Sequence, residues 1–235
     1  MDQPSTTRPA ATKASGFEFY LKVFLIFAFA SGTLAHLLPA VLPVTRYTTD
    51  GLLLVLNGLL LYAIQKRNQD TALLWWLVVA YVFTFTMEAV GVATGAIFGE
   101  YTYGPTMWAQ WLGVPFVIAL NWCALTLACN EVAIRLVGVP RRQERSFLVR
   151  SVFAALIAGI LTALYDVVIE PVAIELDYWS WAAVEIPLQN YLAWAAIAFA
   201  ISLPLHLLGI RFRSPLLLVY FFAQLFFFVV LNLML

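Results

Sequence analysis

Long apolar runs separated by short polar segments make up most of the chain, and this pattern predicts a helical membrane protein. A helix rises about 1.5 Å per residue, so roughly 20 apolar residues cross about 30 Å of hydrocarbon. The predicted spans cover residues 19–42, 48–65, 72–97, 111–136, 147–169, 188–208 and 215–235. The second span is the least regular, because its apolar run is short and Pro39 and Pro43 bend the approach to it. The expected fold is an all-α, polytopic transmembrane bundle of about seven helices.

Residues 1–16 differ from the rest of the chain, because Ser, Thr, Pro and Ala dominate there and little apolar surface is available for burial. We predict a disordered N-terminal tail for this segment and a single transmembrane helical domain over residues 17–235. A cleaved signal peptide is the competing interpretation, but its apolar core would be too long.

Basic residues indicate the orientation of the bundle. Of the 13 Lys and Arg residues, only Arg46 lies outside the tail, loops and span ends that seven spans place on the N-terminal side. Cytoplasmic loops are enriched in Lys and Arg, so we expect a cytoplasmic N-terminus and an outer C-terminus in a multi-pass protein of the cell membrane. The net charge is zero and only 11% of residues are charged, so nothing indicates a nucleic-acid partner.

Ionisable side chains are costly inside a membrane, so each one in a span is a candidate functional group. The predicted spans and their ends contain His36, Glu88, Glu131, Asp166 and His206. Glu131 and His206 lie near cytoplasmic ends, where long side chains reach the headgroups, and Arg135 follows Glu131 by one helical turn. We interpret these two as structural. A lone histidine such as His36 is also more often a hydrogen-bonding group than a catalyst.

Glu88 lies in the apolar sequence FTFTMEAVGVATGA, about two-thirds of the way across its span. An isolated carboxyl group at that depth tends to bind a proton. Gly91 and Gly95 follow on the same helix and would let another helix approach closely. A structural hydrogen bond between helices and a catalytic role both fit this residue.

Asp166 and Glu170 are four residues apart in YDVVIEPVA, so they project from one helix face with β-carbons about 5–6 Å apart. We expect Pro171 to end this helix, which places both carboxyl groups at a C-terminus where the macrodipole disfavours negative charge. Only Arg46 offers a positive charge on that side. Coupled carboxyl groups divide their proton affinities and can leave one acid and one base at neutral pH. Two solvated carboxylates are the alternative.

Two predicted outer loops add polar and aromatic groups. FGEYTYG supplies Glu100, Tyr101 and Tyr103, and IELDYWSWAAVEIPLQN supplies Tyr178, Trp179, Trp181 and Asn190. Trp and Tyr concentrate at membrane interfaces, so we assign Trp179 and Trp181 to the interfacial belt by default.

The absence of several motifs narrows the chemistry. The two histidines fall on different spans, which argues against zinc or di-iron sites built from clusters of His and carboxylate ligands. No Walker, dinucleotide-binding or HExxH pattern occurs, and the last span has no lysine for a retinal Schiff base. The sequence therefore predicts acid–base chemistry by carboxyl groups in an apolar, aromatic-lined site, without a metal or other cofactor.

Four separated motifs resemble the membrane-bound carotenoid hydratase family. They are GEYTYG, LGVPFVIALNW at 112–122, DVVIEPVAIELDYWSW at 166–181 and IPLQNYLAW at 186–194. The family comprises bacterial γ-carotene 1′-hydroxylases and archaeal bisanhydrobacterioruberin hydratases, and the similarity covers roughly residues 20–235. The resemblance implies a carotenoid substrate and addition of water across the terminal double bond of an acyclic (ψ) end group, giving a tertiary 1′-hydroxyl.

An alkene is a weak base, so its protonation needs a neutral carboxylic acid in an apolar place, and aromatic faces can stabilise the tertiary cation that forms. We predict that Asp166 and Glu170 form the acid and base pair, with Glu88 as the other contender for proton donor. The groups expected to position water and substrate are Asn121, Asn190, Tyr101, Tyr103, Glu100 and His36. Membrane lipid and other carotenoid-pathway enzymes are the expected partners.

Two alternatives remain open. An integral-membrane carotene cyclase would start with the same protonation, but an internal double bond would capture the cation. A non-enzymatic carrier of lipid or pigment, or a proton-coupled transporter, would use Glu88 and Asp166 as a proton relay. No inverted repeat of the kind found in many transporters is visible.

Overall fold

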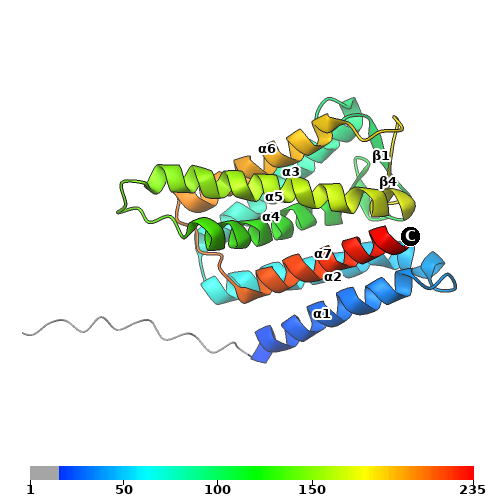
Figure 1. Ribbon diagram of the computed structural model, residues 1–235, viewed down its shortest axis with the longest axis horizontal. Coiled ribbons are helices and arrows are strands. Elements are labelled where there is room, and N and C mark those ends of the chain that lie inside the picture. The colour runs from blue at the N-terminus through cyan, green and yellow to red at the C-terminus, as the bar shows by residue number, and fades with distance from the viewer. Residues whose placement is uncertain (1–15) are drawn as a thin grey trace, which may run out of the picture.

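The computed structural model describes residues 16–235, which form a bundle of helices that run alternately in opposite directions (Figure 1). The helices are α1 (Gly16–His36), α2 (Leu42–Asn68), α3 (Thr71–Thr94), α4 (Phe116–Val137), α5 (Phe147–Glu175), α6 (Leu188–Leu207) and α7 (Pro215–Met234). All seven are long and apolar enough to cross a membrane. The predicted all-α, polytopic bundle is confirmed. The predicted tail lies outside the described residues, apart from Gly16, which begins α1.

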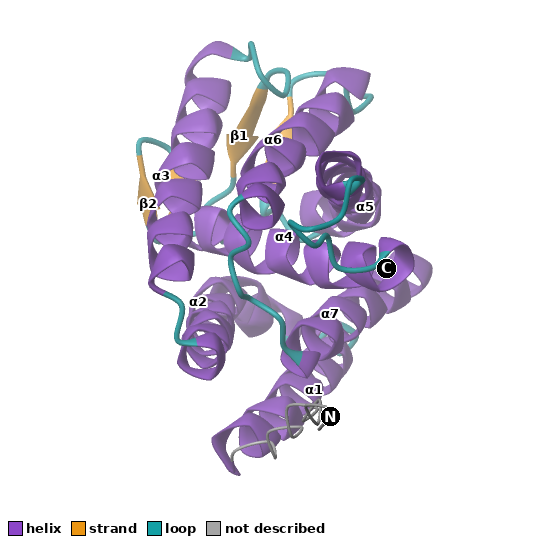
Figure 2. Ribbon diagram, turned by 90° about the vertical axis from the view of Figure 1, so that its left-hand side faces the viewer, coloured by secondary structure: helices purple, strands orange, loops and turns teal. Residues whose placement is uncertain are grey.

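Helix α4 is the centre of the bundle. In its most apolar stretch 78% of the residues are buried inside the protein, against 33–44% in the other six helices. Helices α1, α2 and α7 lie on one side of α4, and α3, α5 and α6 lie on the other (Figure 2). Helices α5 and α6 pack closely, because a β-carbon at Gly159 would lie 2.6 Å from the carbonyl oxygen of Ala195. Small residues allow this approach in a membrane, where packing and hydrogen bonding drive helix association.

The two ends of the bundle differ, and we name them by their contents. The strand end carries the α1–α2, α3–α4 and α5–α6 connections and the C-terminus (Figure 1). Two short antiparallel pairs lie there, β1 (Tyr101–Tyr103) with β4 (Trp179–Trp181), and β2 (Gln110–Trp111) with β3 (Val114–Pro115). The basic end carries the α2–α3, α4–α5 and α6–α7 connections, which hold the clusters of Lys and Arg. That the strand end faces outward stays a prediction.

The expectation that Pro171 ends its helix is wrong, since α5 continues through it to Glu175. A proline inside a helix removes one backbone hydrogen bond and crowds the preceding turn, a cost that packing must offset. Val172 and Ala173 beyond it are buried in the core, and the Tyr178 N–H donates to the Ala173 carbonyl. The extra turn places Asp166 and Glu170 inside the helix rather than at its end.

Helix α2 is longer than the predicted second span, because it begins at Leu42 instead of residue 48. Pro43 occupies its first turn, where the missing N–H needs no partner and the fixed φ suits a helix. Of the two prolines expected to bend the approach, Pro43 therefore belongs to the helix itself, and Pro39 precedes it.

Candidate active site

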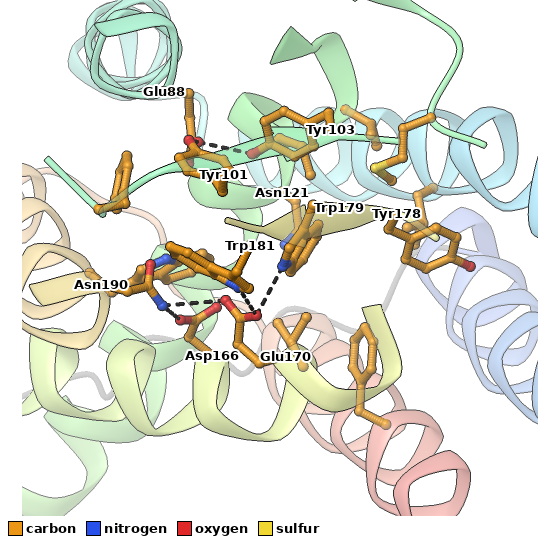
Figure 3. A pocket seen from close by; sticks show the side chains of 18 of the residues that line it. Glu88, Tyr101, Tyr103, Asn121, Asp166, Glu170, Tyr178, Trp179, Trp181 and Asn190 are labelled. Carbon is orange, nitrogen blue, oxygen red and sulfur yellow. Dashed lines mark hydrogen bonds between the residues drawn. The ribbon is translucent and has the colours of Figure 1, made fainter. Parts of the chain in front are cut away.

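A cavity of about 60 Å³ lies at the strand end of the bundle, next to β1 and β4 (Figure 3). Its walls come from helices α2 to α7 and from the two strands with their loops. Three carboxyl-bearing residues line it, Glu88, Asp166 and Glu170, and each is at most 3% exposed. The remaining wall is mostly aromatic and aliphatic, so these groups share an apolar enclosure. The cavity has room for about two water molecules, given about 30 Å³ for each in the liquid.

Asp166 and Glu170 meet at one amide group (Figure 3). The Asn190 side-chain nitrogen donates to Asp166 Oδ2 at 2.6 Å and to Glu170 Oε1 at 3.3 Å. Glu170 Oε2 accepts two further bonds, from the indole nitrogens of Trp179 and Trp181, each at 2.9 Å. Asp166 Oδ1 is buried, and no group among residues 16–235 pairs with it. The two carboxyl groups therefore have unequal surroundings, with three donors on Glu170 and one on Asp166.

Glu88 accepts three hydrogen bonds from aromatic side chains. Tyr101 and Tyr103 donate to its Oε2 at 2.5 and 2.9 Å, and the Trp122 indole nitrogen donates to its Oε1 at 2.8 Å. Burial, together with the nearby Glu88 carboxyl group, raises the pKa of the Tyr101 and Tyr103 hydroxyls well above the usual value. Both tyrosines therefore stay protonated and act as donors. The Trp122 ring stacks on Trp194 with centroids 3.9 Å apart, which fixes its orientation.

The glycines after Glu88 do not serve the predicted close helix contact. A β-carbon at Gly91 would meet the Phe98 ring at 2.6 Å and the Tyr101 hydroxyl at 3.3 Å, so this glycine leaves room for the loop and for β1. Gly95 ends α3 with a φ of 66°, a conformation that glycine adopts readily. Both residues shape the chain around Glu88 rather than a helix interface.

One β-ribbon delivers four of the aromatic side chains. Tyr101 pairs with Trp181 and Tyr103 with Trp179, and all four line the cavity. Side chains alternate along a strand, so Thr102 and Ser180 lie on the opposite, exposed face, with their hydroxyl oxygens 3.3 Å apart. The tyrosines of β1 donate to Glu88 on α3, and the tryptophans of β4 donate to Glu170 on α5. The ribbon thus connects two helices through their buried carboxyl groups.

Comparison with known proteins gives the family. Residues 49–235 match the family described as "Carotenoid biosynthesis protein", a range that includes every residue lining the cavity. The chain belongs to this family. A bisanhydrobacterioruberin hydratase of Haloarcula japonica is 30% identical over 122 residues, which are 50% of this chain and 39% of that relative. No solved structure matches the chain.

Membership in the carotenoid biosynthesis protein family and similarity to a hydratase support a carotenoid-modifying role for this multi-pass membrane protein. The resemblance seen in the four sequence motifs is therefore confirmed at the level of the family. The named relative is much longer than the matched segment, so its activity and substrate enter below only as proposals.

Of the remaining predicted residues, some line the cavity and others lie outside it. Asn121 lines the cavity, and its Oδ1 accepts bonds from the Tyr220 hydroxyl at 2.7 Å and from Gln224 at 3.2 Å. Glu100 has an exposed side chain in a surface groove beside the ribbon and does not line the cavity. Among residues 16–235, no group of three His, Cys, Asp or Glu side chains could hold a metal ion.

His36 lies in a second, smaller cavity of about 40 Å³, which shares Tyr178 and Gln224 with the first. Its Nδ1 donates to the Gly32 carbonyl at 2.7 Å, so in the neutral ring Nε2 is the acceptor. That nitrogen lies 3.2 Å from the Thr49 hydroxyl and 3.4 Å from the Tyr178 hydroxyl. The histidine is hydrogen-bonded between elements, beside the carboxyl cavity rather than in it.

Sequence reasoning missed several residues of this carotenoid biosynthesis protein. The default assignment of Trp179 and Trp181 to the interfacial belt gave them no role in the site, whereas both indole nitrogens donate to Glu170. The matching YxY and WxW spacings in two loops could have indicated a paired ribbon with one aromatic face. Asp50, fully buried in α2, was not among the candidates; its Oδ2 accepts from the Ala109 N–H and ties the α3–α4 loop to α2.

Proposed function

We propose that this protein adds water across the terminal 1′,2′ double bond of an acyclic carotenoid end group and produces a tertiary 1′-hydroxyl. The observation that carries the proposal is the convergence of three buried carboxyl groups, all with neutral hydrogen-bond donors, on one apolar cavity. A carotenoid is dissolved in the bilayer, and the cavity lies among membrane helices. The relative from Haloarcula japonica is named a hydratase, which agrees with this chemistry.

Asp166 is the proton donor in this proposal. Hydrogen bonds to a carboxylate stabilise its charged form, and Glu170 accepts three while Asp166 accepts one. When the pair holds a single proton, that proton therefore resides on the unpaired Asp166 Oδ1. The π electrons of the terminal double bond form a new C–H bond with this proton at C2′. Asp166 becomes a carboxylate, and C1′ becomes a tertiary cation.

The cation is stabilised by fixed groups already aimed at the cavity. The carboxylate of Glu170, together with the ring faces of the ribbon tyrosines and tryptophans, offers negative charge and electron density. A water oxygen then forms a bond to C1′, and Glu170 takes the proton that the water loses. Transfer of that proton back to Asp166, through a water molecule in the cavity that both carboxyl groups line, restores the starting state. No electrons are gained or lost in the cycle.

A carotene cyclase would use the same acid but would exclude water from the cation. Three amide side chains line the cavity, from Asn121, Asn190 and Gln224, and amides bind water through both their donor and acceptor atoms. This lining favours hydration over cyclisation. The two reactions are separable by mass, because hydration adds one water and cyclisation leaves the mass unchanged.

The test uses the purified full chain in detergent micelles that contain γ-carotene or lycopene. We expect a product heavier by one water without any added cofactor, and its loss in Asp166→Asn. A product of unchanged mass but altered absorption would replace hydration by cyclisation. Binding of the pigment without conversion would favour a carrier. Full activity in each of Asp166→Asn, Glu170→Gln and Glu88→Gln would eliminate the carboxyl mechanism.

A further inference from the structure

One polar cluster, two of whose three residues line the cavity, has no part in the proton transfers described above. It consists of Asn121 on α4 with Tyr220 and Gln224 on α7. Gln224 is 1% exposed and lines both the carboxyl cavity and the smaller cavity that contains His36. Its neighbours along α7 are mainly Leu, Val and Phe, so an amide here is a departure from the composition of the helix.

The hydrogen bonds of the cluster orient the Gln224 amide. The Tyr220 hydroxyl donates its single proton to Asn121 Oδ1 at 2.7 Å and so can only accept from Gln224. Gln224 Nε2 lies 3.2 Å from the Tyr220 oxygen and 3.2 Å from Asn121 Oδ1, and it donates to both. The amide nitrogen is therefore held by hydrogen bonds to Tyr220 and Asn121, and Oε1 takes no part in these bonds.

Gln224 Oε1 is buried, and no group among residues 16–235 donates to it. Leaving a buried acceptor unpaired costs about 1–3 kcal/mol, so such atoms in native proteins have a water or ligand partner. The adjoining cavity of about 60 Å³ is large enough for water, and its other walls supply the carboxyl groups. Gln224 thus brings an oriented, unpaired acceptor to the wall of a water-sized space that the carboxyl groups also line.

We propose that Gln224, oriented by Tyr220 and Asn121, holds the water molecule that captures the carotenoid cation. The proposal rests on the hydratase function proposed above. The water donates one O–H to Gln224 Oε1 and the other to a cavity carboxylate, which leaves an oxygen lone pair free for C1′. As the C–O bond forms, the carboxylate takes the second proton, and Gln224 remains unchanged. Gln224 is a positioning residue, because it acts through the water and not on the polyene.

The proposal predicts a change in the fate of the cation. Without a positioned water, the cation loses a proton and returns to an alkene instead of becoming an alcohol. In D₂O the acidic group exchanges its proton for deuterium, so each failed hydration can leave deuterium in the recovered, unhydrated carotenoid. Proton transfer and water capture can therefore be measured separately in one reaction mixture.

The experiment incubates the full-length protein in detergent with γ-carotene in D₂O and analyses the pigments by mass spectrometry. For Gln224→Leu we expect at least tenfold less hydroxylated product, while deuterium in the unhydrated carotenoid equals or exceeds that of the unmodified protein. Tyr220→Phe removes only the hydroxyl that orients the amide, and we expect the same change in smaller degree. Gln224→Glu retains an acceptor oxygen and should restore part of the hydration lost in Gln224→Leu.

Phe228→Leu is the matched control, since Phe228 lines the same two cavities one turn further along α7 but offers no hydrogen bond to water. We expect its hydration and deuterium signals to change in parallel. Hydration by Gln224→Leu at the unmodified rate would overturn the proposal, and so would a parallel fall of both signals, which indicates a structural role. If the unmodified protein neither hydrates nor deuterates the carotenoid, the hydratase function itself fails.

Discussion

Buried carboxyl groups at the two ends of the bundle have opposite kinds of partner. At the basic end, Glu131 is 1% exposed and accepts from Arg135 at 3.0 Å and from Arg213 at 2.9 and 3.1 Å. At the strand end, Asp166 and Glu170 are buried as deeply, yet within residues 16–235 only amide and indole N–H groups donate to them. The carboxyl groups of the two regions are equally buried. They differ in their hydrogen-bond donors, which are charged at the basic end and neutral at the strand end.

The difference has a direct chemical meaning. Two guanidinium groups pair with Glu131 and tie α4 to the α6–α7 connection, so the predicted Arg135 partner is confirmed. At the strand end, Arg46 pairs with Asp177 at 3.3 Å and donates to the Leu176 carbonyl instead of reaching the cavity. Carboxyl groups without a cation can hold and release a proton, which is what hydration of an alkene requires.

The largest expected effect is at Asp166. Asp166→Asn keeps the size of the side chain but removes the acid, and general acid catalysis typically contributes about 10²–10⁴-fold. We expect a loss of hydroxylated carotenoid of that order per milligram of purified protein, measured by chromatography and mass. Glu131→Gln serves as the matched control, and its folded fraction should hydrate at the unmodified rate. Equal losses in both variants would remove the distinction between the two ends.

The second effect concerns stability at the basic end. Glu131→Gln keeps the shape but removes the charge that two arginines share, and a hydrogen bond to a charged group contributes about 1.5–3 kcal/mol. Both arginines are nearly half exposed, at 48% and 44%, so we expect the lower part of this range. The thermal midpoint in detergent should fall by several degrees. Arg145→Gln is the control, an exposed change without an ion pair in the described part of the chain, and should leave the midpoint unchanged.

The third effect tests the tryptophans of the ribbon. Trp181→Phe removes one of three donors to Glu170 while keeping an aromatic ring, and a charge-assisted bond of about 1.5 kcal/mol corresponds to roughly tenfold in rate. We expect hydration to fall by about that factor with normal membrane insertion. Trp108→Phe is the comparison, because Trp108 is 64% exposed and lies outside the cavity. If both variants behave alike, donation from Trp181 to Glu170 does not contribute to the reaction.

The fold was predictable from the sequence because bilayer thickness sets the length of each span and basic residues mark alternate loops. Two features escaped. Continuation of α5 beyond Pro171 depends on the burial of Val172 and Ala173, which is a tertiary effect. The ribbon pairs three-residue strands from two distant loops, and segments that short have no periodicity to detect in isolation.

The candidate site was predictable in part for similar reasons. Helical spacing placed Asp166 and Glu170 on one face, and the depth of Glu88 in an apolar run marked it as costly. Which donor each carboxyl group receives depends on side chains from other elements, so the roles of Trp179 and Trp181 could not be derived locally. Gln224 was visible as a polar residue in a span, but the orientation of its amide follows only from contacts with Tyr220 and Asn121.

The smallest expected effect is on the hydration rate when residues on the two faces of the ribbon are changed. Tyr103→Phe removes one of three donors to Glu88, and Tyr101 and Trp122 remain, so we expect hydration to fall only about two- to fivefold, as for a weak neutral hydrogen bond. Thr102→Val changes the exposed face and should have less than half that effect, since the Thr102 hydroxyl contacts the Ser180 hydroxyl rather than a carboxyl group. Because burial raises the Tyr103 pKa, the unmodified protein should show no loss of rate from tyrosine ionisation up to pH 10. A larger loss in Thr102→Val than in Tyr103→Phe would mean that ribbon pairing, and not donation to Glu88, controls the reaction.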